Sequence, residues 1–222
     1  MKKIKICGLT RPEDIEAVNE AKPDYIGFLF AENKRRTVNR QQAAELKRLL
    51  SDDITAVGVF LNQSVDFIVS LVQEGIIDMI QLHGDEDAAY ILSLREKTNA
   101  PVMKAVRARN SETILLADSL PVDYILIDAY QKGSYGGTGM TFDYSIIPQL
   151  SKPYFIAGGL NPDNLSASLA IPAFGLDLSS GAETDGVKDK KKIIQIVKTV
   201  RGESICQRED SEYTAVSISP KH

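Results

Sequence analysis

Eight short apolar runs, separated by stretches with helical spacing, constrain the fold of this chain more than any other feature. The runs cover residues 4–7, 25–30, 56–61, 79–83, 102–107, 124–128, 154–157 and 174–178. They show little polar alternation, which is typical of parallel strands that are buried on both faces. Their starts lie about 20 to 31 residues apart, so each connection has room for one helix. Eight such units predict a single closed, parallel (β/α)8 barrel.

An open, doubly wound α/β sheet is the alternative architecture. No GxGxxG motif follows the first run, and most open sheets have five or six strands rather than eight. We therefore expect a compact barrel domain over residues 1–201. Residues 202–222 are polar, charged and poorly periodic, and we expect them to form a short C-terminal tail of unknown role. Residues 213–219 alternate enough for a strand, although a frayed tail is the simpler expectation.

Helix start signals support the alternation of strands and helices. Thr10 and Glu13 have the spacing of a capping box around Pro12, which would begin the first helix. Asn161 precedes Pro162, as expected for an N-cap residue followed by the first helical position. Both signals predict a helix directly after a strand.

Composition excludes several classes of function. The chain has 26 basic and 30 acidic residues and a net charge of −4, so no basic face is expected for nucleic acid. No run approaches the roughly 18 apolar residues that a membrane span requires, and the N-terminus has no signal-peptide core. The expected location is the cytoplasm. Cys7 and Cys206 have neither disulfide-framework nor zinc-site spacing and should be free thiols.

Residues that follow the strands are the candidates for chemistry, because barrels of this type place their active sites at the C-terminal strand ends. Cys7 ends the first run as a candidate reactive thiol, and Asp128 ends the sixth run, where a partly desolvated carboxyl group is suited to proton donation. A cysteine at such a position is more often a small buried hydrophobe, and an aspartate there often caps a turn. Gln81 and His83 end the fourth run, where they could orient a ligand.

Two loops and one arginine are candidates for anion binding. Gly158 and Gly159 follow the seventh run, and Ser179, Ser180 and Gly181 follow the eighth, where barrels often bind phosphate through backbone N–H groups. Arg36 follows the second run, and its guanidinium could hold a carboxylate. Arg35 could share that role. Each of these residues could equally be part of an ordinary turn or a solvated charge run.

Taken together, five segments resemble the phosphoribosylanthranilate isomerase family over about residues 3–201. They are Lys5–Thr10, Gln81–Gly84, Gly136–Gly139 with Thr141–Asp143, Ala157–Pro162 and Asp177–Gly181. The resemblance implies an Amadori rearrangement in tryptophan biosynthesis. In this reaction N-(5-phosphoribosyl)anthranilate becomes 1-(2-carboxyphenylamino)-1-deoxyribulose 5-phosphate, with no cofactor and no metal.

The resemblance also assigns roles to residues. Asp128 matches the general acid and Cys7 the general base, Arg36 matches the position that holds the anthranilate carboxylate, and the two glycine-containing loops match the phosphate site. The chain departs from the family pattern at Lys34, Tyr144 and Ala182, none of which is a proton-transfer group. The expected partner is therefore a phosphorylated small molecule.

Alternatives remain at this point. A histidine-pathway aminoaldose isomerase performs a related rearrangement but typically uses two aspartates, and a non-catalytic phosphate-binding barrel would need no Cys7. A sugar-phosphate epimerase would need metal-binding histidines, of which the chain has only His83 and the terminal His222. The sequence leaves open whether the barrel is a monomer or a homodimer, and how Cys7 loses its proton. Lys5 is a poor candidate for assisting it, because it lies one layer lower on the same strand face.

Overall fold

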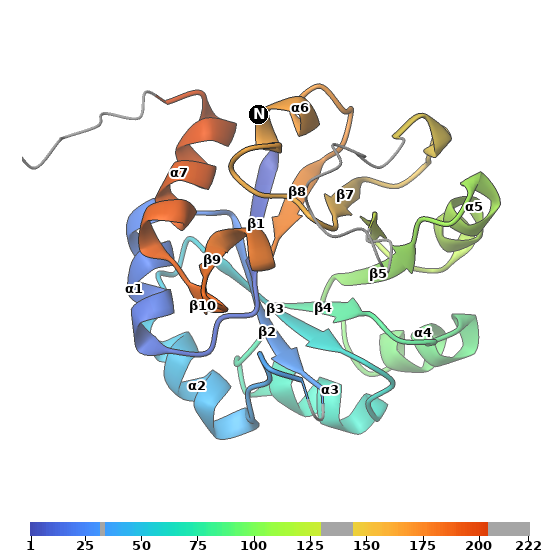
Figure 1. The fold of residues 1–222 in the computed structure, drawn as a ribbon. Coiled ribbons are helices and arrows are strands. Elements are labelled where there is room, and N and C mark those ends of the chain that lie inside the picture. Colours follow the sequence, from blue (N-terminus) through green and yellow to red (C-terminus); the bar gives the residue numbers. More distant parts are fainter. Residues whose placement is uncertain (32–33, 130–143, 204–222) are drawn as a thin grey trace, which may run out of the picture.

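Eight parallel strands form a closed barrel in which the last strand pairs with the first (Figure 1). The computed structural model describes residues 1–31, 34–129 and 144–203. The strands are β1 (Lys3–Cys7), β2 (Tyr25–Phe30), β3 (Thr55–Phe60), β4 (Met79–Leu82), β5 (Val102–Arg107), β6 (Tyr124–Asp128), β7 (Tyr154–Ala157) and β8 (Gly175–Leu178). The predicted (β/α)8 barrel is confirmed, and every strand boundary agrees with the prediction to within one residue.

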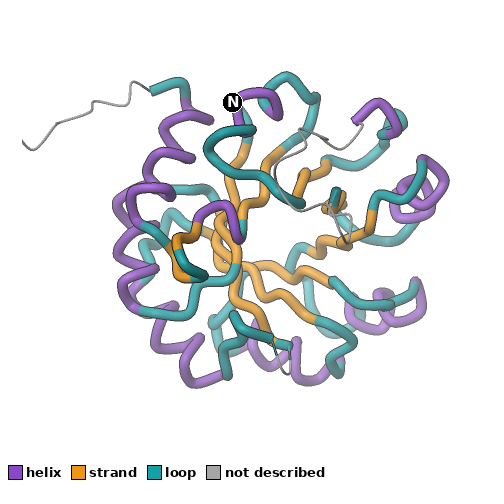
Figure 2. Tube along the Cα trace, viewed as in Figure 1, coloured by secondary structure: helices purple, strands orange, loops and turns teal. Residues whose placement is uncertain are grey.

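Helices surround the strands as an outer ring (Figure 2). They are α1 (Pro12–Ala21), α2 (Arg40–Leu49), α3 (Val65–Gln73), α4 (Ala88–Arg95), α5 (Ser111–Ser119), the short α6 (Leu165–Ser168) and α7 (Lys190–Arg201). Between β6 and β7 the described residues contain only the 3-10 turn η1 (Tyr144–Ile146). After β8 the chain forms a second 3-10 turn, η2 (Ser180–Ala182), and a small hairpin of β9 (Glu183–Thr184) and β10 (Val187–Lys188).

Polar N-cap residues start most of the longer helices. The side chains of Asn39, Ser64, Asp87, Asn110 and Asp189 each accept a hydrogen bond from a backbone N–H in the first turn of the following helix. These bonds satisfy donors that have no partner within the helix. Each loop from a strand to one of these helices therefore ends at a defined N-cap residue.

The prediction for the start of α1 was wrong by one residue. Arg11 is the N-cap residue, and Asp14 takes the place expected for Glu13. The Asp14 carboxylate accepts hydrogen bonds from the backbone N–H groups of Thr10 and Arg11 at 2.9 and 3.1 Å. Its other oxygen accepts from the Arg11 guanidinium, so the aspartate side chain, rather than Thr10, closes the turn.

The prediction that Asn161 and Pro162 begin a helix was also wrong. Asn161 accepts hydrogen bonds from the backbone N–H groups of Asp163 and Asn164, which forms a turn. Helix α6 starts only at Leu165, with Asn164 as its N-cap residue. Asn161 thus makes the side-chain hydrogen bonds of an N-cap residue, but the residues directly after it form a turn rather than the start of a helix.

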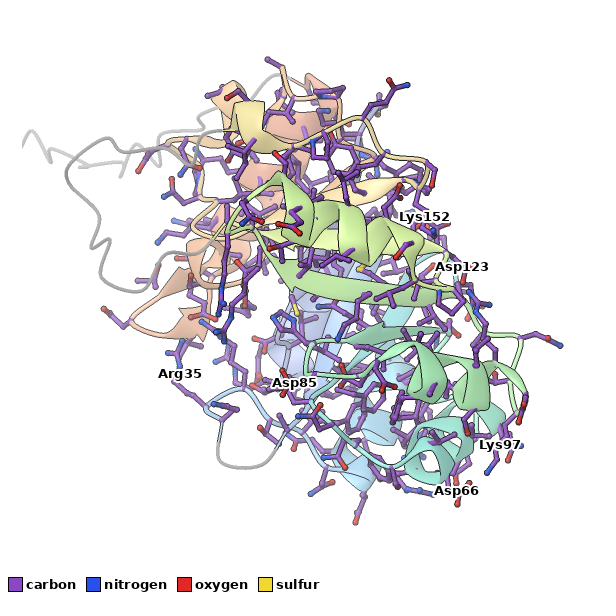
Figure 3. All side chains as sticks on the ribbon, turned by 90° about the vertical axis from the view of Figure 1, so that its right-hand side faces the viewer. Arg35, Asp66, Asp85, Lys97, Asp123 and Lys152 are labelled. Atoms are coloured by element: carbon purple, nitrogen blue, oxygen red, sulfur yellow. The ribbon has the colours of Figure 1, made fainter. Side chains whose placement is uncertain are left out.

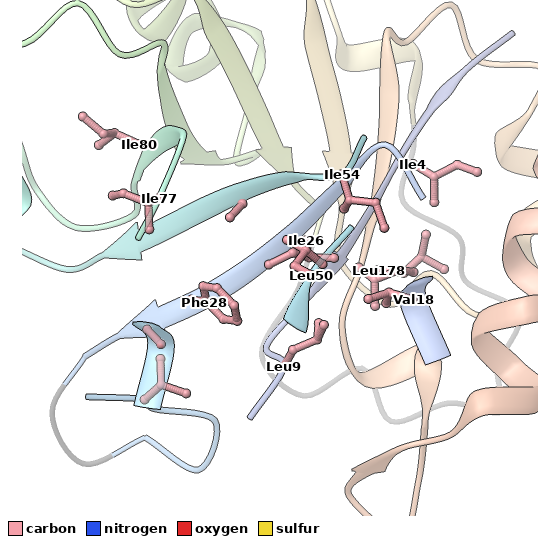
Figure 4. Close-up of a cluster of buried hydrophobic side chains, with 14 of the residues drawn as sticks. Ile4, Leu9, Val18, Ile26, Phe28, Leu50, Ile54, Ile77, Ile80 and Leu178 are labelled. Carbon is pink, nitrogen blue, oxygen red and sulfur yellow. The ribbon is translucent and has the colours of Figure 1, made fainter. Parts of the chain in front are cut away.

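Both faces of the strands are buried, which explains why the strand sequences are nearly continuous in apolar residues. The outer face packs against the helices; in the part of this cluster that Figure 4 shows, Leu178 of β8 lies beside Val18 of α1. The inner face carries a separate cluster, in which the Phe155 ring meets Tyr25, Tyr124 and Phe174 edge-on with ring centres 5.4 to 6.1 Å apart.

Several predictions lie outside the described residues. They concern the glycine-rich segment at 136–139, Cys206, the possible strand at 213–219 and the tail as a separate unit, so the division at residue 201 stays a prediction. Among the residues that the structure describes, no helix is long and apolar enough to cross a membrane.

Candidate active site

A cavity of about 460 Å³ opens at the C-terminal end of the barrel. Nine of the ten predicted site residues line it: Cys7, Arg36, Gln81, His83, Asp128, Gly158, Gly159, Ser179 and Ser180. Figure 3 shows Arg35 on this side of the molecule, far from Asp123 and Lys152, which precede β6 and β7 at the other end. The volume is in the range of small-molecule sites. The barrel thus brings residues from seven of its eight strand ends or following loops to one place.

Cys7 is a free, half-buried thiol at the end of β1. It pairs in register with Gly27 of β2, where an added Cβ atom would come within 2.6 Å of its sulfur. Gly27 therefore provides the space for the thiol. Burial raises the pKa of Cys7, and the positive charge of Lys5 partly offsets this effect.

Lys5 forms a buried ion pair with Asp177 of β8 beside this thiol. The Lys5 side chain is completely buried, and its Nζ lies 3.0 Å from both carboxylate oxygens of Asp177. Burial alone would lower the pKa of Lys5, but Asp177 and Cys7 outweigh that effect and raise it. The prediction that Lys5 is a poor partner for Cys7 was wrong, because a lysine one layer lower is long enough to influence the thiol.

Gln81, His83 and Asp128 form a chain across the cavity. The Gln81 side-chain nitrogen lies 3.1 Å from His83 Nδ1, and His83 Nε2 lies 3.9 Å from an Asp128 carboxylate oxygen. Burial lowers the pKa of His83, although Asp128 opposes the shift. Gln81 is almost fully buried, and its Oε1 has no hydrogen-bond partner among the described residues. A buried acceptor of this kind is suited to a donor on a bound ligand.

Arg36 reaches the cavity while it is bound to Glu183. Its Nε and one terminal nitrogen donate to the two Glu183 oxygens at 2.5 and 2.9 Å, and Arg35 donates to the same carboxylate at 2.6 Å. The buried Lys188 adds a third cation at 2.8 Å. Burial by itself would raise the pKa of Glu183, but hydrogen bonds from Arg36 and Lys188 dominate and hold it at about 2.

The two predicted phosphate loops lie side by side. Gly158 and Gly159 have φ values of +96° and +68°, a backbone conformation that favours glycine. Gly181 does not line the cavity. It lies so close to the Leu160 carbonyl that an added Cβ would be 1.9 Å from the oxygen, so it allows the two loops to touch. The Ser179 hydroxyl donates to the Cys7 carbonyl at 3.0 Å and connects the second loop to β1.

A second cavity, of about 530 Å³, lies beside β5 and α5. It shares His83 with the first cavity but contains neither Cys7 nor Asp128. Its buried lysine, Lys104, is already engaged with Glu86 at 2.7 Å. The chemistry-bearing groups therefore concentrate in the first cavity. The described part of the chain contains no cluster of histidine, cysteine and acidic side chains arranged to hold a metal ion.

Sequence reasoning did not identify Asp177, Glu183 and Lys188 as site residues. Asp177 interrupts the apolar strand β8 in the same way as Lys5 interrupts β1. These two opposite charges within apolar strands were the sequence signal from which Asp177 could have been identified. Glu183 and Lys188 belong to the small hairpin after β8, for which no strand pattern was visible.

Comparisons with known proteins identify a family to which the chain is similar. A family model described as N-(5'phosphoribosyl)anthranilate (PRA) isomerase matches residues 4–199. The N-(5'-phosphoribosyl)anthranilate isomerase of Endomicrobium trichonymphae is 46% identical over 202 residues, which are 90% of this chain and 99% of that protein.

Solved structures show the same similarity. The phosphoribosyl anthranilate isomerase of Thermotoga maritima superposes with a TM-score of 0.78 at 30% identity and covers 91% of this chain and 100% of that one. A phosphoribosyl anthranilate isomerase in complex with reduced 1-(o-carboxyphenylamino)-1-deoxyribulose 5-phosphate gives a TM-score of 0.75 at 27% identity, with the same coverage.

Proposed function

The chain belongs to the N-(5'-phosphoribosyl)anthranilate isomerase family, and on that premise we propose that Cys7 and Asp128 perform its proton transfers. The protein is an isomerase of tryptophan biosynthesis that converts N-(5-phosphoribosyl)anthranilate to 1-(2-carboxyphenylamino)-1-deoxyribulose 5-phosphate. The observation that carries the proposal is that Cys7 and Asp128 line one cavity together with Arg36 and the two glycine-containing loops.

The reaction needs one acid and one base near C1 and C2 of the sugar. Asp128 protonates the furanose ring oxygen, the C1–O bond breaks, and the anthranilate nitrogen forms a protonated Schiff base with C1. The Cys7 thiolate then removes the proton from C2, which gives an enolamine. Proton transfer to C1 and loss of the proton from the C2 hydroxyl produce the aminoketone. A cavity that fixes both groups around one ligand lowers the entropic cost of these steps.

His83 supports the acid. The Gln81 amide nitrogen lies 3.1 Å from Nδ1, and an imidazole whose Nδ1 accepts this bond carries its hydrogen on Nε2, which faces Asp128. The lowered pKa of His83 keeps the ring neutral at pH 7. A neutral N–H donor 3.9 Å away can stabilise the negative charge that develops on Asp128 as it donates its proton.

Separate anion sites hold the two ends of the substrate. The bonds to Glu183 use two of the five N–H groups of Arg36, which leaves others for the anthranilate carboxylate. We assign the phosphate to Gly158, Gly159, Ser179 and Ser180, whose loops meet at the cavity wall. The family match favours this reaction over the histidine-pathway isomerase and the non-catalytic barrel.

The test is turnover of freshly prepared phosphoribosylanthranilate, followed by the loss of anthranilate fluorescence. We expect Cys7→Ala and Asp128→Asn each to lower kcat by a factor of at least about 100, because each removes one proton-transfer group. Cys206→Ala is the matched control and should retain wild-type turnover. Thermal unfolding of each variant must match the wild type. Full activity of Cys7→Ala or Asp128→Asn would refute the assigned roles.

Other expectations from the sequence stay predictions. They are the cytoplasmic location, the absence of a cofactor and of a metal, and the choice between a monomer and a homodimer.

A further inference from the structure

A buried ion pair lies directly beside the proposed base, and the reaction as written does not use it. Lys5 and Asp177 occupy inward-facing positions of adjacent strands and are paired in register, and the lysine has no exposed surface. A buried ion pair seldom stabilises a fold more than apolar side chains of the same size would. Its position inside the barrel therefore requires another explanation.

The surroundings limit what the Lys5 ammonium can act on. Tyr25, Tyr124 and Phe155 pack against one another at inward-facing positions near the N-terminal ends of their strands. Asp177 accepts from the ammonium with both oxygens and lines the catalytic cavity. Cys7 lies two residues after Lys5 on the same face of β1, and the Lys5 charge affects the pKa of Cys7 and, as one of several causes, that of His83. The ion pair thus faces the floor of the cavity beside the thiol.

We propose that Lys5 is a positioning residue that favours the thiolate form of Cys7, and that Asp177 both anchors the Lys5 ammonium and limits its effect. The proposal rests on the proposed role of Cys7 as the base. Cys7 is half-buried and open to the cavity, so its thiol proton exchanges with the solvent. The thiolate fraction is then set by pH and by the neighbouring charges.

The charges around Cys7 oppose one another. Lys5 and, more weakly, Lys188 favour the thiolate, whereas Asp177 disfavours it. His83 is neutral, and the remaining charged groups of the site are Asp128, the Arg35 and Arg36 guanidinium groups, Lys34 and Glu183. A further positive charge arises in the reaction itself, when the protonated Schiff base forms. Lys5 therefore limits the rise in pKa that burial causes, and the substrate cation completes the activation.

The test compares two substitutions that must shift the same thiol in opposite directions. In a Cys206→Ala background, the rate of Cys7 alkylation by iodoacetamide is measured between pH 6 and pH 10. Removing the cation with Lys5→Met should slow alkylation at pH 8 about tenfold or more, because an adjacent opposite charge typically shifts a pKa by one unit or more. Removing the anion with Asp177→Asn should accelerate it. In each variant the acidic side of the pH profile of kcat/KM should shift along the pH axis in the same direction as the alkylation profile.

Lys104→Met is the matched control. It removes another buried lysine from a short ion pair, with Glu86, but outside the catalytic cavity. It should lower stability and leave the Cys7 profile unchanged. If the single Lys5 variant does not fold, the double variant Lys5→Met/Asp177→Asn removes both charges and should give a profile between those expected for the two single variants.

An unchanged alkylation profile in Lys5→Met, or shifts of the same sign in the Lys5 and Asp177 variants, would overturn the proposal. Failure of the proposed function is distinguishable, because it would appear as full turnover in Cys7→Ala, whereas alkylation reports on the thiol whether or not it is the base.

Discussion

Substitution of Glu183 by glutamine tests the cluster that holds Arg36. Glu183 is almost fully buried and accepts hydrogen bonds from Arg35, Arg36 and Lys188. These cations outweigh the effect of burial and hold its pKa at about 2, against an ordinary value of 4.5. Glutamine mimics the protonated carboxyl group, so the substitution removes the charge and keeps the shape.

The pKa difference sets an upper limit on the effect. A difference of about 2.5 pH units corresponds to roughly 3.4 kcal/mol of stability at pH 7. The side chain of Arg35 is 57% exposed, and solvent screens its charge, so we expect a loss of about 1 to 2 kcal/mol. Because the folded-state pKa lies below the unfolded one, the contribution is complete above about pH 4.5. It is lost as the pH falls towards 2.

Urea unfolding at pH 7 and pH 3 measures this dependence. The difference in unfolding free energy between wild type and Glu183→Gln should shrink by at least half at pH 3. Glu74→Gln is the matched control, because Glu74 pairs with Arg40 at an exposed site, and its effect should stay within about 0.5 kcal/mol at both pH values. A loss that is equal at pH 7 and pH 3 would refute the electrostatic explanation.

Three further substitutions test other parts of the site and the barrel. Arg36→Ala should raise KM about tenfold or more with a smaller effect on kcat, because it removes charged hydrogen bonds to a remote carboxylate; an unchanged KM in steady-state assays would transfer that role to Arg35. Gly27→Ala should lower kcat at least tenfold while circular dichroism stays unchanged, since the new Cβ would lie 2.6 Å from the Cys7 sulfur; normal turnover would contradict this. Phe155→Ala should cost about 3 to 5 kcal/mol of stability in urea unfolding, because Phe155 is fully buried among the inner aromatic side chains; a loss below 1 kcal/mol would contradict it.

The strands could be predicted from sequence because burial on both faces leaves a simple signal. The run Tyr154–Ala157, for example, lies between Pro153 and Gly158, and the side-chain period of two then decides which of its residues face inward. Helix starts were less predictable. Several side chains near Pro12 can cap a helix, and only the contacts of Asp14 with Thr10 and Arg11 show which one does.

Those residues of the candidate site whose positions follow from the barrel topology could be predicted from the sequence. Cys7, Asp128 and the glycine-containing loops end strands or follow them, so they reach the same cavity. Hydrogen-bond partners do not follow from topology. No sequence pattern indicated that Arg36 would be held by Glu183, which lies 147 residues later in a hairpin of two-residue strands.

The Lys5–Asp177 pair lies between these two cases. The partners are 172 residues apart, and they meet only because β8 closes the barrel against β1. Yet a lysine in the middle of an apolar strand must be paired once it is buried, because an isolated buried charge is too costly. Asp177 is the acidic residue in the middle of the strand that closure places next to β1. The requirement for a counter-ion, applied together with barrel closure, would therefore have found Asp177 from the sequence. It would also have placed the positive charge of Lys5 beside Cys7. Strand periodicity alone had led us to consider Lys5 a poor candidate for assisting this thiol.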